Sequence, residues 1–453
     1  MINGIYRLTG KIALNSPLLI GSGEAETSDI DVVRDSEGKP FIPATSFIGA
    51  IKSHIMNNFE TKNDDKELKD IWGFTDKQNA KASSILCSDL LLIGENKSTE
   101  IRDGIAIDPK TGIVIEHHKY DYEIVPKGAK FSLKIDAPYS EKNKKIIKKL
   151  LSTLISELED NTDFRLGAKS TNGLGKIKLN DKKFCDFDFS NKENFVAYLS
   201  DKEAPIVKDN EQPQLYEKNQ NKFTASLSLN IKNSFIQRSY PTSSDEPDAV
   251  NIKSDGKYVM TGSGTKGAIR NRALRIVNTL LNSNEEEPQF IKNLFGYVVK
   301  PDGNKIEHKY KSKAGRLRVE ETTIEQYIAE LQNRIALDRF TGGTMKAALY
   351  DSLALFYKTN AANMPSLILN FSVKDCSEAE AGLMLLIIKD LWTGDLAIGG
   401  EKNVGRGVFE GLLAEINFNG KKYKLTRNDT KEFVSLQEYV DSLINELGVS
   451  NGK

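Results

Sequence analysis

The chain has 453 residues, of which 39% are apolar and 28% are charged, and its 63 lysine and arginine residues balance 63 aspartate and glutamate residues. This length suits two or three domains, and the zero net charge confines any nucleic-acid-binding surface to local basic patches, because phosphate binding usually needs a basic excess. The sequence has no long apolar run, no basic and apolar leader after Met1 and no Cys-x-x-Cys pair among its three cysteines, so we expect a cytoplasmic protein without a membrane partner, a disulfide framework or a zinc site.

The first half of the chain is predicted to be an α+β unit. Residues 5–14 alternate apolar and polar side chains, which is typical of a strand with one buried face. A short hairpin with a Glu-Gly turn at 37–38 follows, and then a helix begins at Ala44, where free backbone N–H groups suit an anion. A second helix is expected over 144–159, directly before a glycine-rich segment that begins at Gly167.

The second half repeats this order of elements. It has a strand at 223–231, a hairpin with an Asp-Gly turn at 255–256, helices over 262–281 and 378–392, and a glycine-rich segment from Gly399. Strand, helix, strands, helix and strand predict a two-layer α+β fold of ferredoxin-like type in each half. We expect a first domain over 1–183, a polar linker over 184–222, a second domain over 223–432 and a C-terminal helix or tail over 433–453.

The two halves are diverged copies of one sequence, which we call copy one and copy two. The segment 105–121, IAIDPKTGIVIEHHKYD, matches 335–351, IALDRFTGGTMKAALYD, at seven of seventeen positions with an offset of 230 (335 minus 105). Unrelated segments of this length would share about one identity, on average residue frequencies. Earlier motifs recur at an offset of 218 and the glycine-rich segments at 232, so the chain is a tandem duplication whose loops differ slightly in length.

Two of the repeated segments are candidates for contact with nucleic acid. Glycine is the usual residue wherever φ is positive, so a tight hairpin explains the glycine-rich segments, although close approach of their backbone to a phosphate chain is an alternative. The repeats at 105–121 and 335–351 enter an excursion rich in apolar side chains, and unstacked bases pack on such surfaces. The candidate phosphate contacts of the glycine-rich segments are Gly167, Lys169, Gly173, Gly399, Lys402, Gly405 and Arg406.

An acidic loop before the first hairpin is the candidate for chemistry. Copy one has Asp29 and Asp31 before Val-Val-Arg-Asp, and copy two has Asp248 before Ala-Val-Asn-Ile-Lys-Ser. An alignment without gaps pairs Asp29 with Asp248 at an offset of 219, whereas a rigid offset of 218 sets Ala249 opposite Asp31 and pairs neither aspartate. Ordinary solvated loop acids are the alternative explanation for each of these residues.

These motifs together resemble the RAMP superfamily. The resemblance is carried by the aspartate before Val-Val-Arg-Asp, the junction FIPATSFIGAIK, the I-A-x-D-x-x-T-G segment and GGEKNVGRG near the end, and it covers about 10–179 and 223–416. Within the superfamily, the chain is most similar to the backbone subunits of type III CRISPR effectors, the Csm and Cmr filament proteins. Its two copies resemble the fused double-backbone subunit of type III-D systems.

The resemblance implies that each copy is a modified RRM-like palm that binds guide CRISPR RNA, with a β-hairpin thumb that flips out one base. It implies that Asp29 and Asp248, with Asp31 as the alternative, hold Mg²⁺ or Mn²⁺ transiently and cleave complementary target RNA. The implied partners also include the other backbone, cap and small subunits of the effector. The implied thumb residues are Thr111, Ile113, Thr341 and Met345, and the implied guide contacts at the helix starts are Thr45, Ser46, Lys52, Ser263, Thr265, Lys266 and Arg270.

Two other functions are alternatives on this sequence. One is a scaffold that binds guide RNA and cuts nothing. The other is a stand-alone RNA-processing endonuclease of the same superfamily, which would usually use a histidine as general acid or base. The second alternative is disfavoured, because the residues of copy two that correspond to His54, His117 and His118 are Arg272, Ala347 and Ala348.

Overall fold

The computed structural model contains two compact units that largely follow the two copies. The main division falls between Asn219 and Gln220, inside the predicted linker. The first unit comprises Met1–Ile105, His117–Ser170 and Leu174–Asn219, and the second comprises Ala106–Glu116, Thr171–Gly173 and Gln220–Lys453. The structure describes residues 2–23, 26–75, 79–94, 98–160, 163–202, 214–218, 221–239, 241, 245–298, 312–358, 364–426 and 434–448.

The first unit is built on an antiparallel sheet. Its central strand, β1 (Gly4–Leu14), pairs with β8 (Lys130–Tyr139) on one side and with β9 (Ile177–Asp188) on the other. The short strand β4 (Leu86–Cys87) pairs with the outer side of β8. Numbered along the chain, these strands lie in the order fourth, first, third, second across the sheet.

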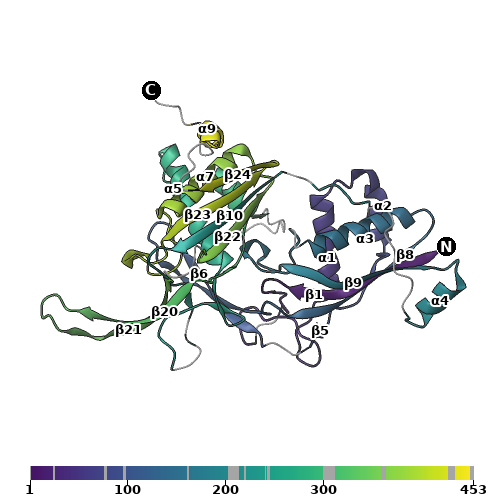
Figure 1. Ribbon diagram of the computed structural model, residues 1–453, viewed down its shortest axis with the longest axis horizontal. Helices are drawn as coiled ribbons and strands as arrows, with labels where there is room; N and C mark the ends of the chain where they lie inside the picture. The colour runs from purple at the N-terminus through teal and green to yellow at the C-terminus, as the bar shows by residue number, and fades with distance from the viewer. Residues whose placement is uncertain are drawn as a thin grey trace, which may run out of the picture. The chain divides into compact units, whose positions relative to one another are not determined.

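Two helices lie on one face of this sheet (Figure 1). The helix α1 (Ala44–Asn58) follows β1, and α3 (Lys144–Glu159) joins β8 to β9. Phe47, Ile51 and Ile55 recur at helical spacing on α1 and are at most 1% exposed, so the apolar face of the helix is buried. The order of strands and helices is consistent with a ferredoxin-like unit. The other elements are η1 (Lys62–Asp64), α2 (Asp65–Trp72), β2 (Phe74–Thr75), β3 (Ala80–Lys81), β5 (Leu92–Ile93) and α4 (Lys192–Leu199).

The second unit has the same sheet order. Its central strand, β10 (Lys222–Ile231), lies between β22 (Leu367–Lys374) and β23 (Phe409–Phe418), and β18 (Leu317–Val319) pairs with the other side of β22. An added strand, β24 (Lys421–Thr426), extends the sheet beyond β23. The helices are α5 (Gly262–Leu281), α6 (Gln289–Phe295), α7 (Glu378–Thr393) and α9 (Gln437–Glu446), and the short strands are β11 (Ser234–Phe235), β12 (Arg238–Ser239), β13 (Val250–Asn251), β14 (Lys253–Ser254), β15 (Lys257–Met260), β16 (Gly296–Tyr297), β17 (Lys313–Ala314) and β19 (Thr322–Thr323).

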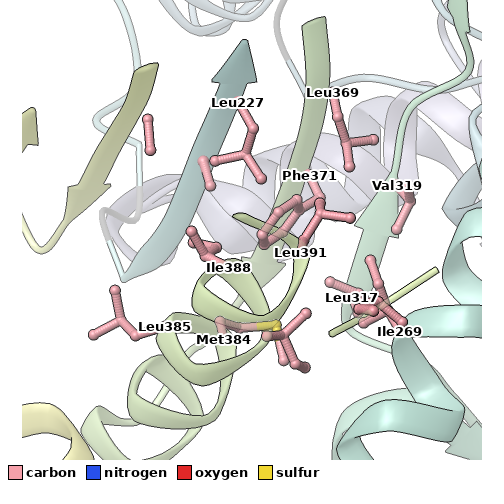
Figure 2. Close-up of a cluster of buried hydrophobic side chains, with 14 of the residues drawn as sticks. Leu227, Ile269, Leu317, Val319, Leu369, Phe371, Met384, Leu385, Ile388 and Leu391 are labelled. Atoms are coloured by element: carbon pink, nitrogen blue, oxygen red, sulfur yellow. The ribbon is translucent and has the colours of Figure 1, made fainter. Parts of the chain in front are cut away.

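The core of the second unit lies between this sheet and its helices. Figure 2 shows Leu227 from β10 and Leu369 and Phe371 from β22 facing Ile269 of α5 and Ile388 of α7, and all five are at most 3% exposed. Burial of each such side chain contributes about 1.5–3 kcal/mol. Truncation of the fully buried Leu369 to alanine is therefore expected to cost about 2–5 kcal/mol, which includes the cavity that it leaves.

The predicted helices are found at the expected places, and in copy two capping residues mark where they begin. The helix α5 covers the predicted range, 262–281, and Thr261 caps it by accepting a hydrogen bond from a backbone N–H of its first turn. The helix α7 begins at Glu378, where Ser377 and Glu380 form a capping box. The mixed helix and strand class predicted from the sequence is thereby confirmed.

The segment predicted as a linker contains ordered structure of the first unit. The strand β9 continues to Asp188, beyond the expected boundary at 183, and α4 follows it. Near the end of the segment, Tyr216 is 4% exposed and donates its hydroxyl hydrogen bond to Asp64 over 2.9 Å. Apolar burial thus fixes parts of a segment whose composition is polar. Residues 203–213, 219 and 220 of the segment, and 427–433 and 449–453 around the predicted tail, lie outside the described residues.

Candidate functional site

A long hairpin ends in the same turn in each copy. In copy one, β6 (Glu100–Ile107) pairs with β7 (Val114–Ile124). In copy two, β20 (Tyr327–Leu337) pairs with β21 (Thr344–Tyr357), and this hairpin extends away from the five-stranded sheet of the second unit (Figure 1). The turn amide of Gly112 donates to the Asp108 carbonyl over 2.8 Å, and Gly342 donates to Asp338 over 2.9 Å. Both glycines have positive φ, 71° and 66°, so the repeated Asp-x-x-Thr-Gly pattern encodes a turn. The predicted thumb threonines belong to it, because Thr111 Oγ1 and the Thr341 amide donate to the aspartate side chains.

Both hairpins expose apolar side chains to solvent. The predicted thumb residues Ile113 and Met345 are 68% and 53% exposed. Phe340 at the turn of copy two is fully exposed, and it was missed in the sequence although it is an aromatic residue in a turn pattern. Clustered apolar exposure marks a surface that binds a partner. The other exposed apolar residues are Ile105, Ile107, Val114 and Ile115 in copy one and Ile335, Leu337 and Leu349 in copy two.

The loop aspartate of each copy is exposed and bonded to a second aspartate on the hairpin. In copy one, the Asp29 amide donates to Asp121 Oδ1 over 2.8 Å, and the Asp121 amide donates to Asp29 Oδ2 over 2.9 Å. In copy two, the same reciprocal bonds join Asp248 and Asp351, at 2.7 and 3.2 Å. The bonds place Asp29 and Asp248 at equivalent positions, as the alignment without gaps expects. Asp121 and Asp351 were not singled out in the sequence, although they end the repeated segment.

Asp31 has a different environment from Asp29. It is 8% exposed, and its carboxylate accepts hydrogen bonds from the backbone or hydroxyl groups of Glu26, Thr27 and Ser28. These donors, led by the Ser28 hydroxyl, hold the pKa of Asp31 well below its usual range. The buried carboxylate of Asp31 therefore holds the backbone of the acidic loop together, whereas the carboxylate of Asp29 is exposed to solvent.

The exposed carboxylate in each copy, that of Asp29 or Asp248, offers the oxygen ligands that suit a weakly held divalent cation. Among the described residues, no three His, Cys, Asp or Glu side chains gather in a way that could hold a metal ion. Mg²⁺ is commonly bound through one or two carboxylates together with substrate phosphate oxygens and waters. A single aspartate with solvent access therefore fits an ion that arrives with a phosphate chain.

The first helix of copy two presents a basic start. Burial, reinforced by the nearby charges of Arg270 and Arg318, lowers the pKa of Lys266 to about 8. Of the other predicted guide contacts here, Ser263 is exposed, whereas Thr265 is fully buried and donates to the Thr261 carbonyl. Arg270 forms an ion pair with Glu287 at 2.5 Å. Burial and the two nearby arginines disfavour the charged form of Lys266, so a bound anion would stabilise that form.

The equivalent helix of copy one is less basic. Its first amide, of Ala44, already donates to the Asp89 carboxylate over 2.7 Å. Thr45 and Ser46 are exposed, as phosphate contacts require. The Lys52 ammonium donates to the Gly73 carbonyl over 3.0 Å, at the end of α2, so it supports the fold locally.

The glycine-rich segments are shaped by their own chain. Gly167, Gly173, Gly399 and Gly405 all have positive φ, between 79° and 103°. A Cβ on Gly167 would lie 2.3 Å from the Leu19 carbonyl oxygen, and one on Gly399 would lie 2.5 Å from that of Ile236. Close backbone packing within the protein thus accounts for these two glycines. Each segment then forms a short 3₁₀ helix, η2 (Ser170–Asn172) in copy one and η3 (Lys402–Val404) in copy two. Lys402, the first residue of η3, is exposed.

The cations of the two glycine-rich segments have different neighbours. Lys169 is held in a left-handed conformation with φ 54°, and its ammonium donates to the Tyr120 hydroxyl over 2.8 Å and lies over the Tyr122 ring. Arg406, predicted to contact phosphate, is instead 1% exposed, with its Nε 2.9 Å from Glu401 Oε2. Its guanidinium is enclosed by protein, so in this conformation its contacts are internal.

The chain belongs to the RAMP superfamily, whose model matches residues 11–178 and 245–410. The two matched regions fall in the two copies, and together they cover more than half of the sequence. The chain is therefore a tandem RAMP protein, and the RAMP superfamily is a superfamily of CRISPR-associated proteins. No curated protein matches it. In the part of the chain that the structure describes, no helix is long and apolar enough to cross a membrane.

Proposed function

We propose that the protein is a guide-RNA-binding backbone subunit of a type III CRISPR ribonucleoprotein and that it cleaves complementary target RNA. The observation that supports this most is the pairing, in both copies, of an exposed loop aspartate with a strand of the hairpin that exposes apolar side chains. A reachable carboxylate fixed to a hairpin with an apolar surface supplies the two kinds of group that base displacement and cleavage would use. The partners would be guide RNA, target RNA and the other subunits of the effector, in the cytoplasm.

The hairpins would act as thumbs that separate neighbouring bases. Ile113 in copy one and Phe340 and Met345 in copy two would pack against bases freed from the stack, because bases bind apolar and aromatic surfaces. Guide phosphates would contact the exposed Thr45, Ser46 and Ser263 at the helix starts, the half-buried Lys266, and Lys169 and Lys402 of the glycine-rich segments. Helix N-termini with free amides favour such anions.

Cleavage would use the nucleophile that RNA itself carries. A nucleotide displaced by a thumb can align its 2′-hydroxyl with the neighbouring phosphate, so positioning supplies much of the rate. Asp29 and Asp248 would hold a divalent ion that offsets charge on the phosphate or assists loss of the hydroxyl proton. The products would be a 2′,3′-cyclic phosphate and a 5′-hydroxyl.

A scaffold without cleavage is the second candidate. The observation in its favour is that the described residues offer two carboxylates at each site and no third metal-binding side chain. The histidine route of a processing endonuclease has less support, because His54 Nε2 lies 2.8 Å from Glu157 Oε2 and is only 10% exposed in its side chain. It is thus engaged within the fold.

One experiment distinguishes these functions. The complex assembled with its neighbouring subunits is incubated with labelled complementary RNA and Mg²⁺ or Mn²⁺, and in parallel with precursor guide RNA. Metal-dependent cuts in the complementary RNA would support the proposal. Tight binding without cuts would support the scaffold, and cuts in the precursor alone would support the processing enzyme.

A further inference from the structure

The reciprocal bonds between the loop and hairpin aspartates link two elements that the proposed reaction needs together. Asp29 lies in the acidic loop, and Asp121 lies on β7, the strand that leaves the hairpin turn. Each backbone amide donates to the other residue's carboxylate, so the loop cannot shift along the hairpin strand without losing both bonds. Asp248 and Asp351, on β21, form the same link in copy two.

The link has been retained while the surrounding contacts have changed. In copy one, the loop is also held by the inner carboxylate of Asp31 and by the bond from the Val32 amide to Glu123. The residues of copy two at these positions are Val250 and Leu353, which have no side-chain acceptor. In copy two, Asn251 instead donates its side-chain amide to the Leu353 carbonyl over 2.8 Å. Across the described residues, only the aspartate pair keeps the same residue types and the same atoms in its link between loop and hairpin strand.

Stability alone gives a poor reason for this retention. The bonds of both pairs are exposed, so water competes with them and reduces the roughly 1.5–3 kcal/mol that a hydrogen bond to a charged group contributes. The link contributes little to stability and yet is present in both diverged copies. A role in positioning the carboxylates of Asp29 and Asp248 explains its presence better.

We infer that Asp121 and Asp351 are positioning residues, each of which fixes the carboxylate of Asp29 or Asp248 beside a strand of the hairpin by accepting the hydrogen bond from that residue's backbone amide. This inference rests on the proposed function. It adds that the hairpin and the cleaving carboxylate move as one element, so a displaced nucleotide arrives at a fixed distance from Asp29. A shift of about 1 Å in such a group costs about a hundredfold in rate.

The test uses two substitutions of Asp121 in the assembled complex, with single-turnover cleavage of labelled complementary RNA as the readout. Asp121→Asn keeps an oxygen acceptor for the Asp29 amide, whereas Asp121→Ala removes it. We expect Asp121→Ala to slow the copy-one cut by about tenfold to a hundredfold at saturating Mg²⁺, and Asp121→Asn to restore most of the rate. The Mg²⁺ concentration for half-maximal rate should stay unchanged in both.

A matched control is Asp103→Ala, which removes an aspartate of the same hairpin whose partner is Lys119 at 3.3 Å. It should leave the cut unaffected. Equal loss of cleavage in Asp121→Asn and Asp121→Ala would overturn the inference, because the charge and not the acceptor would then be required. Wild-type rates in Asp121→Ala would overturn it as well.

Amide hydrogen exchange separates failure of this inference from failure of the proposed function. Asp121→Ala should speed exchange at the Asp29 amide while the protection of β1 stays unchanged. If the wild-type complex cuts nothing, the proposed function fails even where this exchange result holds. If exchange at Asp29 is unchanged in a complex that does cut, the inference fails and the proposed function stands.

Discussion

Arg406 Nε lies 2.9 Å from Glu401 Oε2, and the arginine is 1% exposed. The same glutamate also pairs with Arg238 and Arg334, each at 2.8 Å, so one carboxylate holds three guanidinium groups together. Arg406 Nη2 donates a hydrogen bond to Gln332 over 2.7 Å. The cluster ties the glycine-rich segment of copy two to strand β20 of its hairpin, and its net charge is positive.

Glu401→Gln should destabilise the second unit. Without the carboxylate, three guanidinium groups repel one another in a partly buried site, and removal of one partner of a buried ion pair costs about 3–5 kcal/mol. Chemical denaturation should reveal this loss. The control Glu415→Gln breaks an exposed pair with Lys424 at 3.9 Å and should cost less than about 1 kcal/mol. Equal stability of the two variants would mean that the cluster is already compensated by solvent.

Asp29→Ala should abolish one target cut and leave guide binding intact. The carboxylate is exposed and reaches solvent, so its loss removes the ion-binding group without disturbing the core. The cleavage pattern of labelled complementary RNA measures the effect. An unchanged set of products would show that Asp29 is not the cleaving carboxylate.

Asp31 and Asp35 are the two other aspartates near Asp29 that could serve as control positions, and their contacts differ. Asp31→Ala would remove the acceptor of the donors from Glu26, Thr27 and Ser28 and loosen the whole loop, so its effect on cleavage would be ambiguous. Asp35→Ala is better matched, because the Asp35 carboxylate accepts turn amides, from Glu37 and Lys39. It should retain the cut.

Lys266 should make guide binding depend on pH near 8. Its pKa in the free protein is lowered to about 8, chiefly by burial, and an RNA phosphate would raise it again. Affinity for guide RNA should therefore fall as pH rises from 7 to 9, as the free ammonium loses its proton. Lys266→Arg should remove this dependence, because arginine stays charged. Identical pH profiles for the two proteins would exclude a phosphate contact by Lys266.

The lowered pKa of Lys266 also makes the stability of the fold depend on pH in the absence of RNA. Because the folded pKa lies below the unfolded value near 10.4, the unfolded chain binds more protons between these two pH values. The free energy of unfolding should therefore rise as pH increases from about 8 to about 10, if no other group titrates differently. Lys266→Met should flatten this rise, as measured by urea denaturation at several pH values.

Phe340→Ala should weaken binding of the target duplex without changing stability. The ring is fully exposed, so its removal leaves no cavity in the core. Stacking of a base on an aromatic ring contributes about 1–3 kcal/mol, which corresponds to roughly fivefold or more in affinity. Phe195→Ala on α4, where the ring is 42% exposed, is the control and should bind as wild type. Unchanged binding in Phe340→Ala would exclude the ring as a base contact.

The elements that could be predicted from the sequence are those with local or repeated signals. The bounds of α5 follow from the Thr261 cap and a continuous helical pattern, and the hairpin turns follow from the repeated Asp-x-x-Thr-Gly. The equivalence of Asp29 and Asp248 could be predicted because duplication supplies an internal alignment. Such signals need no knowledge of tertiary contacts.

The remaining features depend on contacts between distant segments. Lys52 and Arg406 are cations in motifs that suggest phosphate, yet their partners, the Gly73 carbonyl and Glu401, become apparent only when the chain is folded. Asp31 differs from Asp29 in burial and in its donors, which sequence spacing does not encode. Tyr216 lies in a polar segment whose composition gives no sign of its buried position.

Asp248→Ala should remove a second cut, separate from the one that depends on Asp29. Asp248 is exposed and bonded to Asp351 as Asp29 is to Asp121, so the carboxylates occupy equivalent positions. Copy two has Ser254 where copy one has Asp35, but the Asp35 carboxylate accepts amides of a turn that copy two closes differently, through Asp255 and Gly256 with φ 50° and 74°. Wild-type complex should therefore give two cuts separated by one thumb-to-thumb interval. If Asp248→Ala gives the wild-type pattern while Asp29→Ala removes every cut assigned to this subunit, copy two holds the guide without cleaving.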